Sequence, residues 1–305
     1  MAQFSYLVGF VGADADRSLG LELHEREAHR HGLRYLCRRV DADARAFRAQ
    51  GLGGFLRACR DFGFSGLDVA RPYRHRVVPY VDELSETAAR VGSVDVIVFT
   101  RDGRTVGHNT DVAGCVAALL RGLPGVPLDR VVQVGAGDAG IAAAYALRER
   151  GVRHLSVTDP VPERARALVE CLNQGDGAAP GRAEAFPAEG LAERLKQADG
   201  LVNSLPTDDT DGTGGAGGGD GADGREVVRP EFLRGDLWIF DTRYHPDRTP
   251  LVRAGSALGC RVLQGGGALV HEAATAFRLV TGRTPHTSSM FGDFADLTAG
   301  PQAHT

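Results

Sequence analysis

The sequence predicts an α/β protein built from two domains, and three observations lead to this prediction. The chain has 305 residues, whereas single domains usually hold about 100–200 residues. Short apolar runs alternate with longer amphipathic runs, as strands and helices do in α/β folds. A glycine-rich turn at 135–140 follows an apolar run and opens an alanine-rich one, which is typical of a Rossmann-type dinucleotide-binding domain.

The first part of the chain, up to residue 110, alternates strand and helix patterns. The expected strands cover 6–12, 35–40, 66–69 and 93–99. The expected helices cover 17–32, 42–62 and 76–91. Pro72 should interrupt regular structure before the last of these helices, because proline lacks a backbone N–H. This order predicts an α/β layer domain.

The second part repeats the alternation with longer buried runs. The expected strands cover 129–134, 154–158, 200–204 and 237–241. The expected helices cover 141–150, 162–172, 191–197 and 269–281. Residues 208–224 are almost all Gly, Asp, Thr and Ala, which predicts a flexible loop. Residues 284–305 are expected to form a loosely held tail.

The composition excludes several classes of protein. The formal net charge is −4 and the sequence pI is near 6.2, so no broad basic surface is available to bind nucleic acid. No run of about 18 apolar residues predicts a membrane-spanning helix, and the N-terminus lacks a signal-peptide pattern. The five cysteines form no CxxC pair, as is usual for reduced thiols. We expect a cytoplasmic monomer or homodimer that binds a small molecule.

The basic residues are unusual, because Lys196 is the only lysine among 35 lysines and arginines. Such a bias is usual for a GC-rich genome. It has a chemical consequence, since arginine stays protonated and only lysine can exchange a proton near neutral pH. Lys196 lies in the expected helix 191–197 of the second domain.

The glycine-rich turn predicts a nucleotide site. Gly135-Ala136-Gly137-Asp138-Ala139-Gly140 matches G-x-G-x-x-G between a strand and a helix. The first glycine permits the turn, the second lets a pyrophosphate approach the backbone, and the third allows close helix–strand packing. Asp159 ends the next expected strand, where a carboxylate accepts hydrogen bonds from ribose hydroxyls and repels a 2′-phosphate. We therefore expect NAD rather than NADP, although Arg164 or Arg166 could reach a 2′-phosphate.

Further motifs resemble the shikimate/quinate dehydrogenase family. Residues 63–74 resemble its G-x-x-G-x-N-V-T-x-P-x-K motif, and residues 107–111 its G-x-N-T-D motif. Later blocks follow in the family's order. Residues 82–85 resemble D-E-L-S, and residues 92–95 resemble G-A-V-N. Residues 135–140 match the nucleotide loop, and residues 202–206 resemble N-A-T-P. Residues 244–246, 249–251 and 265–272 resemble Y-x-P, T-x-L and G-x-G-M-L-V-x-Q, in that order. The resemblance therefore covers most of the chain.

The resemblance implies a shikimate-dehydrogenase-like fold with the active site in a cleft between domains. We expect a substrate domain over 1–112, a cofactor domain over 113–267, a C-terminal helix over 268–288 returning to the substrate domain, and a tail over 289–305. Relatives reversibly oxidise a ring hydroxyl with NAD(P). The implied cofactor-binding residues are Gly135, Ala136, Gly137, Asp138, Ala139, Gly140, Asp159, Asn203, Ser204, Leu205 and Gly265.

The substrate positions differ from the family pattern. The candidates are Ser18, Asp68, Asp95, Tyr244 and Glu272, of which only Ser18 and Tyr244 match the family. Three neutral amides have become carboxylates, which repel an anionic substrate. We therefore expect an atypical substrate in secondary metabolism, a small polyol or ring that carries an amine or lacks shikimate's carboxylate.

The catalytic pair is also altered. The family uses a lysine and an aspartate to handle the hydroxyl proton, and these positions hold Arg74 and Asp111 here. Arg74 cannot exchange a proton, but it can polarise a hydroxyl or carbonyl as a fixed cation. Asp111 is then the expected general base, with Tyr73, His75 or Tyr244 as weaker candidates for a relay.

Other interpretations remain open at this stage. The chain could be a lyase or isomerase with retained NAD, or a non-catalytic NAD-binding regulator. No metal site is expected, because no ligand-spaced partner accompanies His24, His29 and His31, which are interpreted as a solvated helix face. His271 is expected to have a structural role in the last helix.

Overall fold

The computed structural model describes residues 5–12, 19–41, 45–174, 181–205, 227–244 and 249–299. Ser18 and the predicted loop at 208–224 lie outside these residues. Contacts divide the chain into two compact units. The first contains residues up to Thr110 and from Val270 onward, and the second lies between Asp111 and Leu269. No helix in the described ranges is long and apolar enough to cross a membrane.

The first unit is a mixed sheet with helices. Its strands are β1 (Ser5–Gly12), β2 (Arg34–Asp41), β3 (Gly66–Val69), β4 (Glu83–Leu84), β5 (Val96–Phe99) and β6 (Thr105–His108). Its helices are α1 (Leu19–Arg30), α2 (Arg45–Asp61), α3 (Tyr73–Arg76), α4 (Glu86–Val91), α11 (Thr287–Thr298) and most of α10 (Gly266–Thr281), together with a 3₁₀ turn (Val78–Tyr80).

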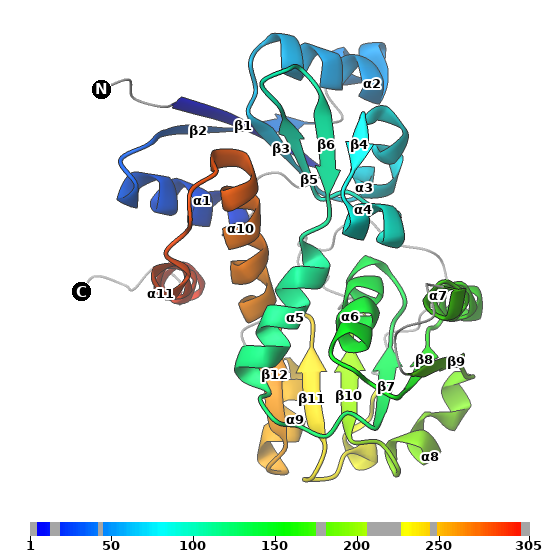
Figure 1. The fold of residues 1–305 in the computed structure, drawn as a ribbon. Coiled ribbons are helices and arrows are strands. Elements are labelled where there is room, and N and C mark those ends of the chain that lie inside the picture. Colours follow the sequence, from blue (N-terminus) through cyan, green and yellow to red (C-terminus); the bar gives the residue numbers. More distant parts are fainter. Residues whose placement is uncertain are drawn as a thin grey trace. The chain divides into compact units, whose positions relative to one another are not determined.

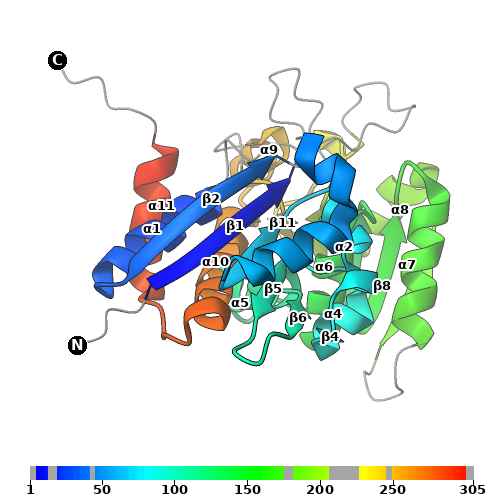
Figure 2. The same ribbon diagram turned by 90° about the horizontal axis from the view of Figure 1, so that it is seen from above.

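The sheet of the first unit has the order β2-β1-β3-β5-β6-β4. Strands β1, β2 and β3 are parallel, whereas β5 is antiparallel to both β3 and β6. Figure 2 shows β1 and β2 side by side; α1 contacts β2, and α11 contacts α1. Fully buried Val8 and Leu67 come from β1 and β3, as alternating apolar residues in strands should.

The second unit is a parallel sheet of six strands. The strands are β7 (Arg130–Val134), β8 (His154–Thr158), β9 (Arg182–Ala185), β10 (Gly200–Asn203), β11 (Trp238–Asp241) and β12 (Arg261–Gln264). The helices are α5 (Asp111–Gly122), α6 (Asp138–Glu149), α7 (Pro162–Gln174), α8 (Leu191–Leu195) and α9 (Pro250–Ala257), with 3₁₀ turns at Ala188–Gly190 and Pro230–Phe232.

The strand order of the second unit is β12-β11-β10-β7-β8-β9. This is the doubly wound order of dinucleotide-binding folds, in which the chain reverses direction beside its first strand. Helices α5 and α6 pack against each other on one side of this sheet (Figure 1). The reversal lies between β7 and β10, so the carboxyl ends of these two strands mark the expected ligand position. The predicted α/β fold class is confirmed.

The structure corrects the helix predicted over 76–91. Helix α3 ends at Arg76, a 3₁₀ turn and β4 follow, and α4 begins only at Glu86. The interruption depends on residues distant in sequence. The Asp82 carboxylate accepts hydrogen bonds from the Thr105 backbone N–H and hydroxyl at 2.7 and 2.8 Å. Local periodicity could not reveal this pairing with the segment that forms β6.

The structure also corrects the predicted C-terminal tail. Thr287–Thr298 form α11, and the Met290 side chain is fully buried against Leu23, Val270 and Ala274. Helix α11 packs on α1. Its amphipathic pattern is short, so burial against these neighbours stabilises it more than helix propensity does.

Candidate active site and cofactor site

The glycine loop after β7 is shaped by packing inside the second unit. Gly135 has φ +103°, and a Cβ there would lie 2.6 Å from Ser204 Oγ. A Cβ on Gly140 would lie 2.3 Å from the carbonyl oxygen of Gly135. Both distances are far below van der Waals contact, so these two glycines are required by the fold itself.

Gly137 differs from the other two glycines. A Cβ at Gly137 would meet no described atom within 4 Å. Gly137 is the N-cap of α6, and as a glycine it has no side chain that could cap this helix end. The first N–H groups of α6 therefore point to an open, exposed surface formed by Gly137 and Ala139. This geometry fits a dinucleotide pyrophosphate, which needs close approach to the backbone.

Two polar side chains hold the loop from within. Ser204 Oγ donates a hydrogen bond toward the carbonyls of Val134 and Gly135, at 3.1 and 3.0 Å. Gln133 is fully buried in β7, and its Nε2 donates to the carbonyls of Gly135 and Gly140, both at 2.8 Å. Sequence reasoning assigned Ser204 to the cofactor and missed Gln133, whose signal was a polar residue in an apolar strand.

Asp159 lies at the end of β8 and faces the same loop. Its Oδ2 accepts a hydrogen bond from Ala136 N at 2.7 Å, and its Oδ1 accepts one from Val161 N at 2.8 Å. Each oxygen keeps a lone pair for a ribose hydroxyl. Arg164 is exposed, and the exposed Arg166 pairs with Glu163 at 3.0 Å. Asp138, by contrast, occupies the first turn of α6.

The carboxyl ends of β10, β11 and β12 complete this region. Asn203 Nδ2 lies 3.5 Å from Asp241 Oδ1, and Leu205 is partly buried against the core. Fully buried Asp241 accepts two hydrogen bonds from the guanidinium of Arg243, at 2.8 and 2.6 Å. A Cβ on Gly265 would lie 1.8 Å from the Thr242 carbonyl oxygen.

Asp241 was not predicted as a site residue, although it ends a buried strand. Its second oxygen accepts a hydrogen bond from the Thr249 hydroxyl at 2.6 Å. These bonds fix the start of the segment that carries Tyr244, which is half-buried. The predicted site residue Tyr244 therefore has a rigid support on one side.

In the first unit, the structure brings Asp68 and Arg74 together. Arg74 Nε donates to the carbonyl oxygen of Val69, the residue after Asp68, at 3.1 Å. Burial raises the pKa of the Asp68 carboxyl, and the charges of His24 and Arg74 offset this only in part. Strand β3 therefore holds a carboxyl group that is easier to protonate than an exposed aspartate.

His24 lies behind Asp68 and corrects the prediction of a solvated histidine face on α1. Its exposed fraction is 1%, and its Nε2 lies 2.9 Å from the Ala273 carbonyl oxygen. A carbonyl only accepts, so Nε2 carries the hydrogen. Nδ1 then faces the Tyr35 hydroxyl at 3.2 Å and Asp68 Oδ2 at 3.7 Å. His29, in contrast, is exposed.

Asp95 is already engaged within the first unit. Its two oxygens accept hydrogen bonds from the Thr110 backbone N–H at 2.9 and 2.7 Å, and one also accepts the Thr110 hydroxyl at 2.8 Å. Asn109 Nδ2 donates to Ser93 Oγ at 3.1 Å. These bonds hold the chain directly before Asp111, which begins α5 and is 8% exposed.

The remaining candidates are less defined by contacts. Glu272 is half-buried on α10, one residue after His271, whose ring packs edge-on against Phe291.

Comparison with known proteins shows to which family the chain belongs. The family model for the shikimate dehydrogenase substrate binding domain matches residues 10–97. The chain is 44% identical, over 97% of both proteins, to a shikimate dehydrogenase (NADP(+)) of Streptomyces avermitilis. It is 38% identical to a quinate/shikimate dehydrogenase (NAD(+)) of Corynebacterium efficiens, over 96% of this chain and 99% of the relative.

A solved structure agrees with this result. Quinate dehydrogenase from Corynebacterium glutamicum in complex with NAD has a TM-score of 0.87 and 36% identity, covering 96% of this chain and all of that chain. The fold and the glycine loop define the class of protein, an enzyme with a Rossmann-type nicotinamide-dinucleotide domain. The chain belongs to the shikimate/quinate dehydrogenase family, oxidoreductases that act on CH–OH groups with NAD(P).

Proposed function

We propose that this chain is an NAD-dependent dehydrogenase of a small polyhydroxylated ring that carries an amine or lacks the carboxylate of shikimate. The observation that carries this proposal is Asp68, a partly buried carboxyl group near Arg74, at a position where the family pattern has a neutral asparagine. A carboxylate there accepts hydrogen bonds from hydroxyl or ammonium groups and repels an anionic substrate.

The charge argument rests on Asp68 and Glu272 more than on Asp95. The Asp95 oxygens are occupied by the N–H and hydroxyl of Thr110, so less of this carboxylate is available to a ligand. Glu272 replaces a family glutamine and is half-buried. Two carboxylates that both face one bound ring would favour a cationic group over an anionic one.

NAD is the proposed cofactor because of Asp159. Its carboxylate is anchored by the amides of Ala136 and Val161, so its charge has a defined place beside the glycine loop. A fixed negative charge disfavours the 2′-phosphate of NADP. Gly135, Gly137 and the N-terminus of α6 would hold the pyrophosphate, and the bound nicotinamide would accept the hydride.

For the reaction itself, we assign the hydroxyl proton to Asp111 and the fixed positive charge to Arg74. Oxidation removes a hydride from carbon and a proton from the hydroxyl, and the Asp111 carboxylate accepts that proton. Arg74 stabilises the negative charge that develops on the oxygen, because its guanidinium cannot lose a proton. Tethering of Arg74 to Val69 orients this cation beside β3.

A second candidate substrate class follows from the relatives. A 44% identical protein is named a shikimate dehydrogenase, so shikimate and quinate are the alternative substrates. Reduced-nicotinamide absorbance with NAD and NADP, over shikimate, quinate, aminocyclitols and amino sugars, decides between them. Turnover of the amine-bearing compounds with NAD supports the proposal, and turnover confined to the acids overturns it.

The variant Arg74→Lys sharpens the same experiment. A lysine restores a group that can exchange a proton, so we expect turnover of shikimate or quinate to rise by about tenfold, a modest part of a general acid–base contribution. The matched control is Arg76→Lys, at an arginine on the same short helix that is not assigned to the site. Equal rates for Arg74→Lys and the unaltered enzyme would remove Arg74 from the proposed mechanism.

A further inference from the structure

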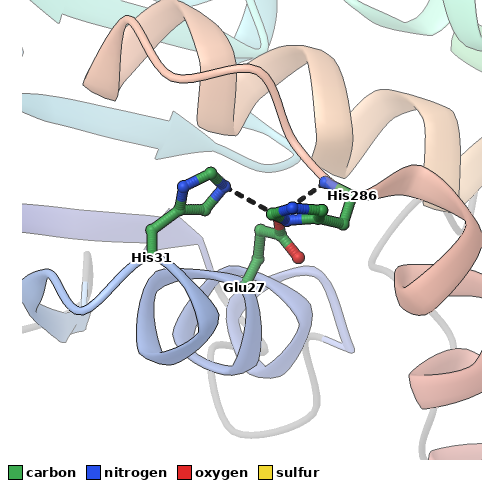
Figure 3. Close-up of side chains that lie close together, drawn as sticks. All are labelled: Glu27, His31 and His286. Carbon is green, nitrogen blue, oxygen red and sulfur yellow. Dashed lines mark hydrogen bonds and ion pairs between the residues drawn. The ribbon is translucent and has the colours of Figure 1, made fainter.

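A carboxylate and two imidazoles meet in the first unit, outside the residues assigned to substrate and cofactor. Glu27 lies in the last turn of α1, His31 directly follows that helix, and His286 precedes α11 (Figure 3). Glu27 Oε1 lies 3.0 Å from His31 Nε2 and 2.9 Å from His286 Nδ1. All three potential ligand atoms lie within 4.8 Å of one another.

Three nitrogen atoms lie within hydrogen-bond distance of Glu27 Oε1. Besides the two ring nitrogens, the backbone N–H of His286 donates to Oε1 at 2.6 Å. A carboxylate oxygen offers about two lone-pair directions, so three N–H donors cannot all be well aligned on it. A cation bound to both imidazoles and to Oε1 would replace two of these protons and leave the backbone hydrogen bond in place.

The surroundings orient these groups as in metal sites. Glu27 is fully buried, and its Oε2 accepts a hydrogen bond from Arg30 Nη1 at 2.8 Å. Arg30 in turn pairs with Asp293 on α11. The His31 ring stacks on Phe277 with ring centroids 5.6 Å apart. Such outer contacts fix ligand orientation in known metal sites.

The cluster is both charged and accessible. Burial raises the pKa of Glu27, but hydrogen bonds from His286 and Arg30 outweigh this and lower the pKa below its usual value. The carboxylate is therefore ionised at neutral pH. The side chain of His286 is 57% exposed, whereas that of His31 is 18% exposed. An ion could enter from the His286 side, and water could occupy a further coordination position there.

We propose that Glu27, His31 and His286 bind a zinc ion that links the end of α1 to the segment between α10 and α11. Two imidazoles and one carboxylate with an open position form a ligand set that zinc uses widely. In tetrahedral zinc sites, ligand atoms lie roughly 3.3 Å apart for Zn–N distances of about 2.0–2.1 Å. The observed 2.9 and 3.0 Å between Glu27 and the two imidazoles would lengthen by a few tenths of an ångström, and the two imidazole nitrogens, which lie within 4.8 Å of each other, would adjust to the same spacing.

The ligand types also decide which ions compete. Nitrogen ligands disfavour Ca²⁺ and Mg²⁺, which prefer all-oxygen sites, and favour Zn²⁺, Co²⁺, Ni²⁺ and Cu²⁺. Each imidazole must offer an unprotonated nitrogen to the ion, so the ligating nitrogens carry no hydrogen when zinc is bound.

The test is zinc binding by the full-length chain after chelator treatment. ZnCl₂ is titrated calorimetrically in a Cys171→Ser background, because Cys171 is an exposed thiol and a competing zinc ligand. We expect one zinc ion per chain, a higher Tm with zinc, and visible Co²⁺ absorption bands of a four-coordinate site. MgCl₂ should produce none of these effects.

Variants assign the ion to this cluster. His31→Ala and His286→Ala should each weaken zinc binding by at least about tenfold, as even outer-contact losses do at metal sites. His29→Ala is the matched control, since His29 is exposed on the same helix and lies outside the cluster. Tm without zinc checks that each variant folds. Absence of saturable binding, or equal binding by the double variant His31→Ala/His286→Ala, overturns the proposal.

Discussion

The glycine loop of the second unit and the substrate-side residues of the first unit differ in how they are constrained. Gly135 and Gly140 are required by contacts inside the fold, and Gln133 and Ser204 hold the loop carbonyls. Asp68, by contrast, differs from the family pattern on a β3 strand that still forms. The glycine loop is therefore constrained by close backbone packing, whereas Asp68 is a side chain that can change without altering the strand that carries it.

Removing the proposed base should have the largest effect. Asp111→Asn keeps the size of the side chain but cannot accept the hydroxyl proton, so we expect turnover to fall by about 10²–10⁴-fold. Steady-state rates with the best substrate measure this loss, and cofactor binding should be unchanged. Asp102→Asn, at an exposed aspartate that pairs with Thr100, is the control. An unchanged rate for Asp111→Asn would contradict the assignment.

Two glycine variants separate folding from cofactor binding. Gly140→Ala places a Cβ 2.3 Å from the Gly135 carbonyl oxygen, so it should lower stability by about 1–3 kcal/mol. Gly137→Ala meets no described atom within 4 Å, so it should preserve Tm and weaken NAD binding. Thermal unfolding and NAD titration are measured for both variants. Equal NAD affinity in Gly137→Ala and the unaltered chain would show that the pyrophosphate does not approach this glycine.

The choice between NAD and NADP should depend on the Asp159 charge. Asp159→Asn keeps an acceptor oxygen near Ala136 N but removes the charge that disfavours a 2′-phosphate. We expect the ratio of kcat/KM for NAD to that for NADP to fall by about tenfold. Glu163→Gln, at an exposed acid of the following helix, tests for a general charge effect. A ratio that stays constant in Asp159→Asn would assign the preference to other residues.

The smallest expected effect is the change in the free energy of unfolding when Asp68 is replaced. Its folded-state pKa is raised by burial, so the folded chain holds this proton to higher pH than the unfolded chain does. Stability should fall as the pH rises from the unfolded pKa of about 3.9 through the folded pKa. Asp68→Asn should therefore be more stable near pH 7 by about 1 kcal/mol, and this gain should disappear near pH 3.

Denaturant unfolding of both proteins across that pH range measures the difference. His24→Asn, measured in the same way, tests the contribution of His24 to the pKa of Asp68. His24 lies 3.7 Å from Asp68 and partly offsets the cost of the Asp68 charge. If Asp68→Asn lowers stability at pH 7 but not at pH 3, the ionised Asp68 carboxylate stabilises the fold. Asp68 would then be constrained by the fold, as the residues of the glycine loop are.

Local patterns predicted most strands of both units. The strands at β7, β8, β10 and β11 are continuous apolar runs because parallel strands are buried on both faces. Strands β6, β9 and β12 and helices α5 and α9 were not predicted. Strand β12 begins at Arg261 and none of its residues is fully buried, so its apolar signal is weak. Its pairing with β11 places it in the sheet.

Contacts between distant segments account for the remaining errors. Helix α11 forms because Met290 is buried against α1 and α10, and no local signal marks that contact. His24, His29 and His31 share one helix in the sequence, but their surroundings differ completely. His24 packs behind Asp68, His29 is exposed, and His31 meets Glu27 and the distant His286.

The sequence by itself determined the α/β class, the glycine loop and the positions where this chain differs from its family, because these depend on residue type and local order. Only the tertiary structure decided what those residues contact. It showed that Gln133 supports the loop, that Asp95 is bound by Thr110, and that His286 reaches Glu27. Such contacts join residues far apart in the chain, and only packing of the whole unit brings them within hydrogen-bond distance.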